Sequence, residues 1–354
     1  MLSEVQIHAQ GSDLETELGD RDPPFYFHTS GTSTGLPKPI PQASSIVSAL
    51  PRLDTASQPA TFSTTPLYHG GLIDCLRCWS SGAMLWLFPE AELPVTAGNV
   101  VRSIDACRKS CTVPIQYFSS VPYVLQMLAE DDYGIRTLQS MKLVGVGGAA
   151  LATVTGDRLV AAGVNLLSRF GSAECGFLAS SHRDYSFDKE WQYLRFGDVK
   201  EFVKFEGRHD DLAELLVKPT WPSKAKTNLN DGSYATSDLF SPHNSLPDTW
   251  MYHSRSDAQV VLSNGKKFDP STTESDILAS LPQLRDVYIF GDGRPQPGIL
   301  IFPHRNTTPK NQIIADVWTE VDAVNSKVPS HAQIALSMTL PTNRKVPTVE
   351  ALIL

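Results

Sequence analysis

The sequence has few charged residues, and neither sign of charge gathers in a long run. Charged residues make up 19% of its 354 residues and apolar residues 41%. This composition excludes a disordered or fibrous protein and fits one large or two ordinary globular domains. The 30 Lys and Arg residues are outnumbered by 38 Asp and Glu residues, and no basic stripe interrupts the excess. We therefore do not expect nucleic acid as a partner.

Recognisable targeting segments are also lacking. The first 20 residues are acidic and broken by polar side chains, whereas a signal or transit peptide needs a basic start or an apolar core. No stretch approaches the roughly 18 consecutive apolar residues of a membrane span. We expect a cytoplasmic protein that does not enter a membrane.

Cysteine is scarce, at five residues, and the odd number argues for reduced thiols rather than a disulfide framework. Four of them form a Cys-x-x-Cys pair and a Cys-x-x-x-Cys pair, at Cys75, Cys78, Cys107 and Cys111. Such pairs can bind zinc. Apolar residues around both pairs instead recur at helical spacing, which favours buried thiols on two helices. We do not predict a zinc site.

Short β-rich runs alternate with stretches of helical spacing through the first 200 residues. The runs are 25–28, 85–88, 115–118, 143–146 and 164–167, and the helical stretches include 123–130 and 153–162. This alternation predicts an α/β fold with layers of sheet and helix.

From about Glu201 the pattern changes to strands and turns. Strands are expected over 214–217, 234–239, 250–253 and 258–262, followed by a turn at Asn264-Gly265. A smaller α+β unit then holds helices over 271–280 and 311–325 and strands over 286–290 and 299–302. We therefore predict a large domain over residues 1–257 and a small C-terminal α+β domain over residues 258–354.

The most informative segment is a loop of small hydroxyl-bearing residues that follows the first β-rich run. Its candidate ligand-binding residues are Thr29, Ser30, Gly31, Thr32, Ser33, Thr34, Gly35 and Lys38. Glycines let backbone N–H groups turn inward, hydroxyls add donors, and the lysine adds a mobile charge, so the loop suits a polyphosphate. The spacing does not match G-x-x-x-x-G-K-[ST], which disfavours that class of nucleotide-binding protein. A plain Ser/Thr-rich surface turn is the alternative.

This loop, Thr29-Ser-Gly-Thr-Ser-Thr-Gly-Leu-Pro-Lys38, resembles the phosphate-loop signature of the adenylate-forming superfamily, which includes acyl-CoA synthetases and adenylation domains of nonribosomal peptide synthetases. Six further segments resemble motifs of the same superfamily and occur in the same order. They are Thr65-Pro-Leu-Tyr-His69, Gly147-Gly-Ala-Ala-Leu151, Phe170-Gly-Ser-Ala-Glu174, Tyr234-Ala-Thr-Ser-Asp238, Tyr252-His-Ser-Arg255 with Asp257, and Pro341-Thr-Asn-Arg-Lys345. The residue pattern around 191–194 and 238–250 is most similar to that of fungal peptide-synthetase-like enzymes, including adenylate-forming reductases.

The resemblance implies an activity and its cofactors. A carboxylic acid attacks the α-phosphate of ATP in the presence of Mg2+, pyrophosphate leaves, and a phosphopantetheine thiol on coenzyme A or on a carrier protein in trans captures the acyl group. It also implies a role in secondary-metabolite biosynthesis. The sequence does not identify the acid.

The resemblance further implies roles for individual residues. Lys38 and its loop would hold the β- and γ-phosphates, Glu174 would hold Mg2+, and Lys345 would stabilise the charge that develops at the α-phosphate. His69 would line the acyl pocket. The nucleotide would be contacted by Gly148, Phe170, Gly171, Ser172, Asp238 and Arg255, with Asp238 accepting hydrogen bonds from the ribose. Asp257 would be the hinge of the small domain.

Several positions depart from the superfamily pattern. Ala173 replaces the usual Thr beside Glu174, Ser237 and Ser254 replace glycines, and Val346-Pro347 interrupts the run after Lys345. Only 28 residues precede the phosphate loop, where the superfamily has well over a hundred. We therefore expect an N-terminally truncated member with an exposed apolar face near its start, which a partner subunit could cover.

Two alternatives to an active enzyme remain open. The first is an inactive homologue that acts as a binding or scaffold protein. The second is a nucleotide-binding protein of unrelated chemistry.

Overall fold

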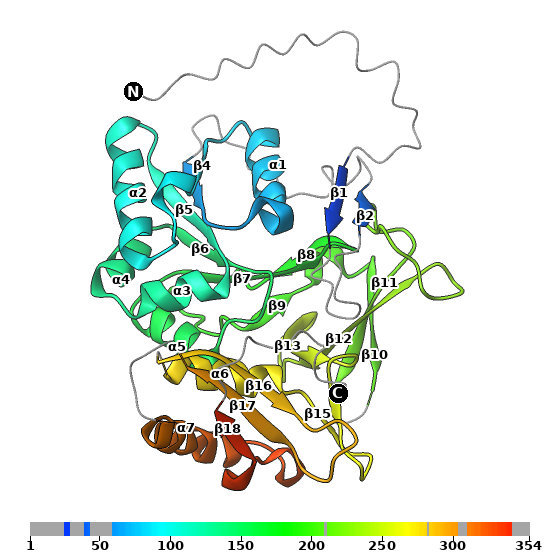
Figure 1. Ribbon diagram of the computed structural model, residues 1–354. Helices are drawn as coiled ribbons and strands as arrows, with labels where there is room; N and C mark the ends of the chain where they lie inside the picture. The colour runs from blue at the N-terminus through cyan, green and yellow to red at the C-terminus, as the bar shows by residue number, and fades with distance from the viewer. Residues whose placement is uncertain are drawn as a thin grey trace.

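The computed structural model describes residues 25–28, 39–42, 59–208, 211–281, 283–303 and 310–341. Within them, one sheet of eleven strands forms the centre of the molecule, in the order β10-β11-β12-β13-β9-β8-β7-β6-β5-β3-β4 (Figure 1). One half of this sheet is parallel and the other antiparallel, and β7 belongs to both.

The parallel half contains β4 (Leu85–Leu87), β3 (Ala60–Ser63), β5 (Ile115–Ser120), β6 (Leu143–Val146) and β7 (Leu166–Ser172). The helices between these strands are α1 (Leu72–Ser80), α2 (Ala97–Ser110), α3 (Pro122–Ala129), α4 (Asp132–Gln139) and α5 (Thr153–Ala161). Apolar side chains of α2, α3, α4 and α5 and of the strands form one buried core, with Phe62 and Phe118 stacked at its centre. The chain therefore covers its parallel strands with helices, as such strands require.

The antiparallel half contains β8 (Gly176–Ser180), β9 (Tyr193–Arg195), β13 (Thr249–Arg255), β12 (Tyr234–Pro242), β11 (Ala213–Val217) and β10 (Val203–Gly207). Its core is aromatic: Phe196 and Phe240 are fully buried, and Phe205 stacks on Trp250 with ring centroids 3.8 Å apart. A separate hairpin pairs β1 (Phe25–His28) with β2 (Pro39–Gln42).

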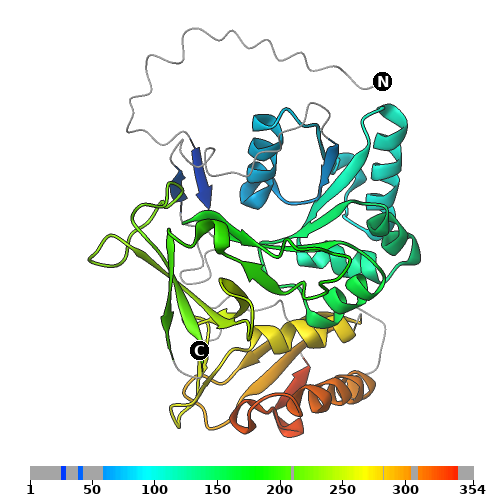
Figure 2. The same cartoon turned by 180° about the vertical axis from the view of Figure 1, so that it is seen from behind.

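A third core lies below the large sheet, around a three-stranded sheet (Figure 2). This sheet consists of β16 (Leu284–Phe290), β17 (Gly298–Pro303) and β18 (Thr339–Pro341), and α6 (Ser271–Ser280) and α7 (Lys310–Asn325) pack on it. The short pair β14 (Val260–Val261) and β15 (Lys267–Phe268) precedes it. The expected α/β class is therefore confirmed. The division into domains at residue 257 stays a prediction.

The expectation of buried thiols on two helices is confirmed for Cys75 and Cys78 and is wrong for Cys111, which lies beyond the end of its helix. Cys75 and Cys78 are buried on α1, Cys107 is half-buried on α2, Cys111 directly follows α2, and all are free thiols. Across the described ranges, no group of three or more His, Cys, Asp or Glu side chains could hold a metal ion. None of the helices there is long and apolar enough to cross a membrane.

Exposed apolar side chains lie near the edge strand β4. Trp79 at the end of α1 is 65% exposed, Leu93 is 57% exposed, and Met84 and Leu87 are also exposed. The expectation of a partner subunit on this side stays a prediction.

Candidate active site

The β1–β2 hairpin fixes both ends of the predicted phosphate loop. His28 pairs with Pro39 and Phe25 with Gln42, so the ten residues between His28 and Pro39 begin and end side by side. These ten residues, Thr29 to Lys38, lie outside the described ranges. The hairpin thus places the entry and exit of the loop.

Gln42 ties this hairpin to the turn that carries Glu174. Its side chain is 1% exposed, and its amide Nε2 donates hydrogen bonds to the carbonyl oxygens of Ala173, at 2.8 Å, and of Ile40, at 3.2 Å. Both views show β1 and β2 beside the turn that begins β8 (Figures 1 and 2). The β1–β2 hairpin and the Glu174 turn are therefore neighbours, although Gln42 and Ala173 are 131 residues apart in sequence. Sequence reasoning missed Gln42 because nothing local distinguishes it from other strand residues.

The Glu174 turn connects β7 to β8 and requires glycine at Gly171. A Cβ atom at Gly171 would lie 2.4 Å from the Gly176 carbonyl oxygen, so no other residue fits there. The Glu174 side chain is 17% exposed, and among the described residues it forms an ion pair with Lys226, whose Nζ lies 3.8 Å from Oε1. A carboxylate this accessible, with one loose ion pair, can take a further cationic partner. Ser172, the last residue of β7, directly precedes this turn.

Phe170 stands at the rim of the aromatic core rather than free in a cleft. Its ring centroid lies 5.1 Å from that of Phe240 in an edge-on contact, and 6.3 Å from that of Tyr252. Both packing partners come from the antiparallel half of the sheet. The ring therefore has a fixed position, which suits a wall for a planar ligand.

Gly148 follows β6 at the carboxyl end of the parallel strands. Its φ of +88° lies in the left-handed region, which side chains other than glycine rarely adopt. The neighbouring Gly147 packs closely on β7, because a Cβ there would lie 3.1 Å from the Arg169 carbonyl oxygen. Ligands of open α/β sheets bind at this edge.

Asp238 and Arg255, which come from two separate motifs, face each other across β12 and β13. They are register partners, and Arg255 Nη1 lies 3.2 Å from Asp238 Oδ1. Asp238 is buried, and burial raises its pKa to about 6 although the charge of Arg255 acts in the opposite direction. Arg255 is bound more closely by Asp257, with Nε–Oδ1 and Nη2–Oδ2 distances of 2.8 and 2.7 Å. Asp238 therefore shares its arginine with a better-placed carboxylate.

Ser237 has the backbone conformation of the glycine that it replaces. Its φ is +65°, and its N–H donates to Glu214 Oε1 at 3.0 Å. Glu214 is itself held by Arg208, whose Nη2 lies 2.6 Å from Oε2. The surroundings thus impose a left-handed conformation on a serine.

Two predicted catalytic residues are not placed in full. His69 belongs to a π-helical turn, η2 (Leu67–Gly71), which runs directly into α1 and lies next to β1, but its side chain is outside the description. Lys345 lies outside the described ranges, four residues beyond the end of β18 at Pro341.

A buried polar network beside these motifs was not foreseen. Asp74 on α1 accepts hydrogen bonds from Arg169 Nη1, at 2.8 Å, and from the Ser119 hydroxyl. Arg169 Nη2 also donates to Ser119 Oγ at 2.7 Å. Burial acts to raise the pKa of Asp74, but the charge of Arg169 and the Ser119 hydrogen bond hold it below its usual range. The network joins α1, β5 and β7 at the carboxyl edge.

Comparison with known proteins supports the resemblance. Residues 257–351 match the family of the AMP-binding enzyme C-terminal domain. The chain is 29% identical over 338 residues to the adenylate-forming reductase Nps10 of Heterobasidion annosum, covering 90% of this chain and 30% of the relative. It is 28% identical over 348 residues to a carboxylic acid reductase of Neurospora crassa, covering 90% of this chain and 32% of that protein. The chain thus spans about a third of the length of these relatives.

Solved structures share the fold at lower identity. The O-succinylbenzoate coenzyme A synthetase of Bacillus subtilis, in complex with ATP and magnesium ion, superposes with a TM-score of 0.65 at 18% identity, covering 92% of this chain and 67% of the synthetase. An anthranilate CoA ligase in complex with anthranoyl-AMP gives a TM-score of 0.65 at 17% identity, covering 91% of this chain and 64% of the ligase. The expected fold is therefore confirmed. The chain is similar in sequence to fungal adenylate-forming reductases, its residues 257–351 match the AMP-binding enzyme C-terminal domain, and it shares the fold of these CoA synthetases and ligases.

Proposed function

We propose that the chain activates a carboxylic acid with ATP. One oxygen of the substrate carboxylate attacks the α-phosphorus, the bond from that phosphorus to the bridging oxygen breaks, and pyrophosphate leaves with the electron pair. The observation that supports this proposal is the Gln42 link, a hydrogen bond of 2.8 Å from the strand that follows the hydroxyl-rich loop to the Ala173 carbonyl oxygen beside Glu174. Phosphate donors and a carboxylate for a cation would then act on the same polyphosphate.

The phosphate end of the nucleotide would be held by the loop of Thr29 to Lys38 and by Glu174. Mg2+ is commonly bound by one or two carboxylates together with substrate phosphates and water. A single accessible carboxylate at Glu174 fits that ligand set. Bound there, the ion would neutralise phosphate charge. Lys345 is proposed to stabilise charge at the α-phosphate, and His69 to line the pocket for the acid.

The nucleoside end would lie between β7, β12 and β13. Asp238 would accept hydrogen bonds from the ribose hydroxyls, and Arg255 would donate beside it. The fixed ring of Phe170 would form one wall, while Gly148, Gly171 and Ser172 would let the backbone approach. These residues come from the two halves of the large sheet, which meet at β7.

The second half-reaction would transfer the acyl group to a phosphopantetheine thiol, on coenzyme A or on a carrier protein in trans. We propose that residues 258–354 form a small domain that turns about Asp257 between the two half-reactions. A role in secondary metabolism, and a cytoplasmic location, belong to the same proposal. The similarity to fungal adenylate-forming reductases supports the metabolic role.

Carboxylate-dependent exchange of labelled pyrophosphate into ATP tests the proposal. We expect exchange with at least one member of a broad panel of aryl, α-keto and aliphatic acids. Glu174→Gln and Lys38→Ala should each lower it at least 100-fold, whereas Glu130→Gln, at an exposed glutamate after α3, should leave it unchanged. A folded protein that exchanges pyrophosphate with no acid would contradict the proposal.

A nucleotide-binding protein without turnover is the second candidate. The observation in its favour is Ala173, which stands beside Glu174 in place of the usual Thr and offers no hydroxyl to a phosphate. ATP at millimolar concentration would then raise the melting temperature without supporting exchange. If ATP neither raises the melting temperature nor supports exchange, this candidate function is excluded as well.

A further inference from the structure

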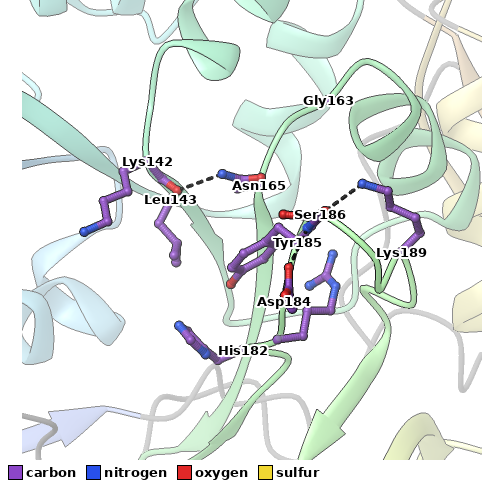
Figure 3. A pocket seen from close by; sticks show the side chains of 10 residues that line it. Lys142, Leu143, Gly163, Asn165, His182, Asp184, Tyr185, Ser186 and Lys189 are labelled. Atoms are coloured by element: carbon purple, nitrogen blue, oxygen red, sulfur yellow. Dashed lines mark hydrogen bonds between the residues drawn. The ribbon is translucent and has the colours of Figure 1, made fainter.

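A pocket of about 520 Å3 opens at the edge of the sheet opposite to the candidate active site (Figure 3). Lys142 and Asn165 line it directly before β6 and β7, so it lies at the amino ends of these strands. His182 and Tyr185, on the segment that follows β8, line its other side. Glu174 and Gly148 lie at the carboxyl ends of the same region of the sheet. None of the residues proposed above for the nucleotide or the acid lines this pocket.

The pocket carries more positive charge than its carboxylates neutralise. Its lining includes Lys142, Lys189 and Arg183 against one carboxylate, Asp184. The Lys189 ammonium is held at the wall by the Tyr185 carbonyl oxygen, 2.6 Å away (Figure 3). Such a surplus is notable in a chain whose net charge is -8.

The surplus of positive charge extends to side chains behind those that line the pocket. The Arg183 side chain is 2% exposed, and its Nε lies 3.7 Å from Asp188 Oδ1. Arg195 takes the other oxygen of the same carboxylate, with an Nη2–Oδ2 distance of 2.5 Å. Two arginines therefore share one aspartate, and Arg183 completes its hydrogen bonds on the carbonyl oxygens of Leu166 and Ser181. Such bonds satisfy the donors of a buried cation but leave its charge uncompensated.

The Tyr185 hydroxyl adds a hydrogen-bond donor that has no partner among the described residues. The hydroxyl oxygen is buried and makes no hydrogen bond to any of the residues that the structure describes. The ring lies across the pocket, with its hydroxyl end towards Leu143 and His182 (Figure 3). Arg183 stacks on the ring at 4.7 Å from its centroid, and the His182 ring contacts it edge-on at 5.8 Å. Since a buried hydroxyl without a partner is costly, a ligand that accepts from it would be favoured.

We propose that this pocket binds the phosphate group of a small molecule. A dianion matches the surplus of positive charge, because Lys142, Arg183 and Lys189 line the pocket with one carboxylate, Asp184, and Arg183 shares Asp188 with Arg195. The lysines supply mobile point charges, and the Tyr185 hydroxyl supplies a directional donor once the ligand is seated. The volume exceeds what phosphate alone needs and leaves room for an organic part.

Inorganic phosphate is the probe, titrated by calorimetry and by melting temperature at constant ionic strength set with sodium chloride. We expect saturable binding in the millimolar range and a matching rise in melting temperature. The double variant Lys142→Gln/Lys189→Gln, at two exposed positions, should weaken binding at least tenfold. Lys200→Gln, at an exposed lysine that does not line the pocket, should not change it.

Tyr185→Phe separates the hydroxyl from the charges. Without phosphate this variant should be at least as stable as the wild type, since it removes a buried hydroxyl without a partner. Its phosphate affinity should fall several-fold. An unchanged phosphate affinity in Tyr185→Phe would show that the hydroxyl does not contact the anion and would overturn that part of the proposal.

Two further experiments test which anion binds and where it binds. Acetate should bind more weakly than phosphate, and equal affinity would contradict selection of a dianion. Lys38→Ala, in the predicted phosphate loop, should keep phosphate binding. If Lys38→Ala abolishes it and the double lysine variant does not, the anion binds at the candidate active site and the pocket proposal is wrong. This result leaves the proposed acid activation untouched.

Discussion

Two buried aspartates, Asp74 on α1 and Asp238 on β12, are each paired with an arginine of the large sheet and behave in opposite ways. Asp74 is held by Arg169 and Ser119, and these partners keep its pKa below the usual range despite burial. Asp238 is also buried, but in its case burial raises the pKa to about 6. The difference lies in the arginines, because Arg169 makes its closest ionic contact with Asp74, whereas Arg255 makes its shortest contacts with Asp257.

This contrast separates a structural pair from a carboxylate that still needs partners. Asp74 already receives the donors that a buried anion requires. Asp238 has one arginine contact of 3.2 Å, and the Thr236 hydroxyl also favours its charged form, but these partners do not offset its burial. Hydroxyl donors from a ribose would complete its shell, which is the role proposed for it. The same substitution at the two positions should therefore have different consequences.

The largest expected effect is that of Asp74→Asn on stability. The substitution leaves the Arg169 charge without its carboxylate in a site where water is largely excluded. We expect the free energy of unfolding to fall by about 3 kcal/mol, measured by urea denaturation at pH 7. Asp105→Asn, which breaks the exposed pair with Arg108, is the matched control and should cost no more than about 0.5 kcal/mol. Equal effects of the two substitutions would refute the structural role of Asp74.

The second prediction has the opposite sign. Asp238→Asn should raise the free energy of unfolding at pH 7, because the amide imitates the protonated form that burial favours. A rise of the pKa from 3.8 to about 6 corresponds to an upper limit of about 3 kcal/mol. If Asp238→Asn instead lowered the free energy of unfolding as much as Asp74→Asn, the two aspartates would not differ and the prediction would be wrong.

The pH dependence of the same variant is the third test. Because the folded-state pKa of Asp238 lies above the unfolded value, its contribution is fully present below pH 3.8 and is lost as the pH rises to about 6. The stability advantage of Asp238→Asn should therefore appear over that interval and be constant above it. Glu274 on α6, whose pKa burial raises to about 7, acts in the same direction in both proteins and cancels in the difference. An advantage that is independent of pH would contradict the raised pKa.

Local elements could be predicted from the sequence, whereas contacts between distant residues could not. The runs that predicted β1, β6 and α6 have the bounds of the structure, because each depends on a local pattern of apolar residues. The motifs assigned Asp238 and Arg255 to the same nucleotide, and that assignment stays a prediction, although the two residues are register partners. The Asp74–Arg169 pair spans 95 residues, and the Gln42–Ala173 hydrogen bond spans 131. Such contacts depend on how the sheet assembles, and no spacing in the sequence records them.

ATP binding gives the fourth prediction, which rests on the proposed function. A carboxylate forms stronger hydrogen bonds to ribose hydroxyls than an amide does. Asp238→Asn should therefore weaken ATP binding by about tenfold, or about 1.4 kcal/mol, although the protein is more stable at pH 7. Calorimetric titration with ATP measures this change, with Asp105→Asn as the control. Unchanged affinity would remove Asp238 from the nucleotide site.

The smallest expected effect is that of Ser237→Gly, one residue before Asp238. A left-handed serine costs about 1 to 2 kcal/mol, and glycine removes this cost but adds roughly 0.5 to 1 kcal/mol through its freedom in the unfolded chain. The net gain should be about 0.5 kcal/mol, measured by urea denaturation, while Ser237→Ala should change little. The backbone N–H to Glu214 stays in both variants, so a loss of stability in Ser237→Gly would mean that the serine hydroxyl, and not the backbone conformation, holds this turn beside Asp238.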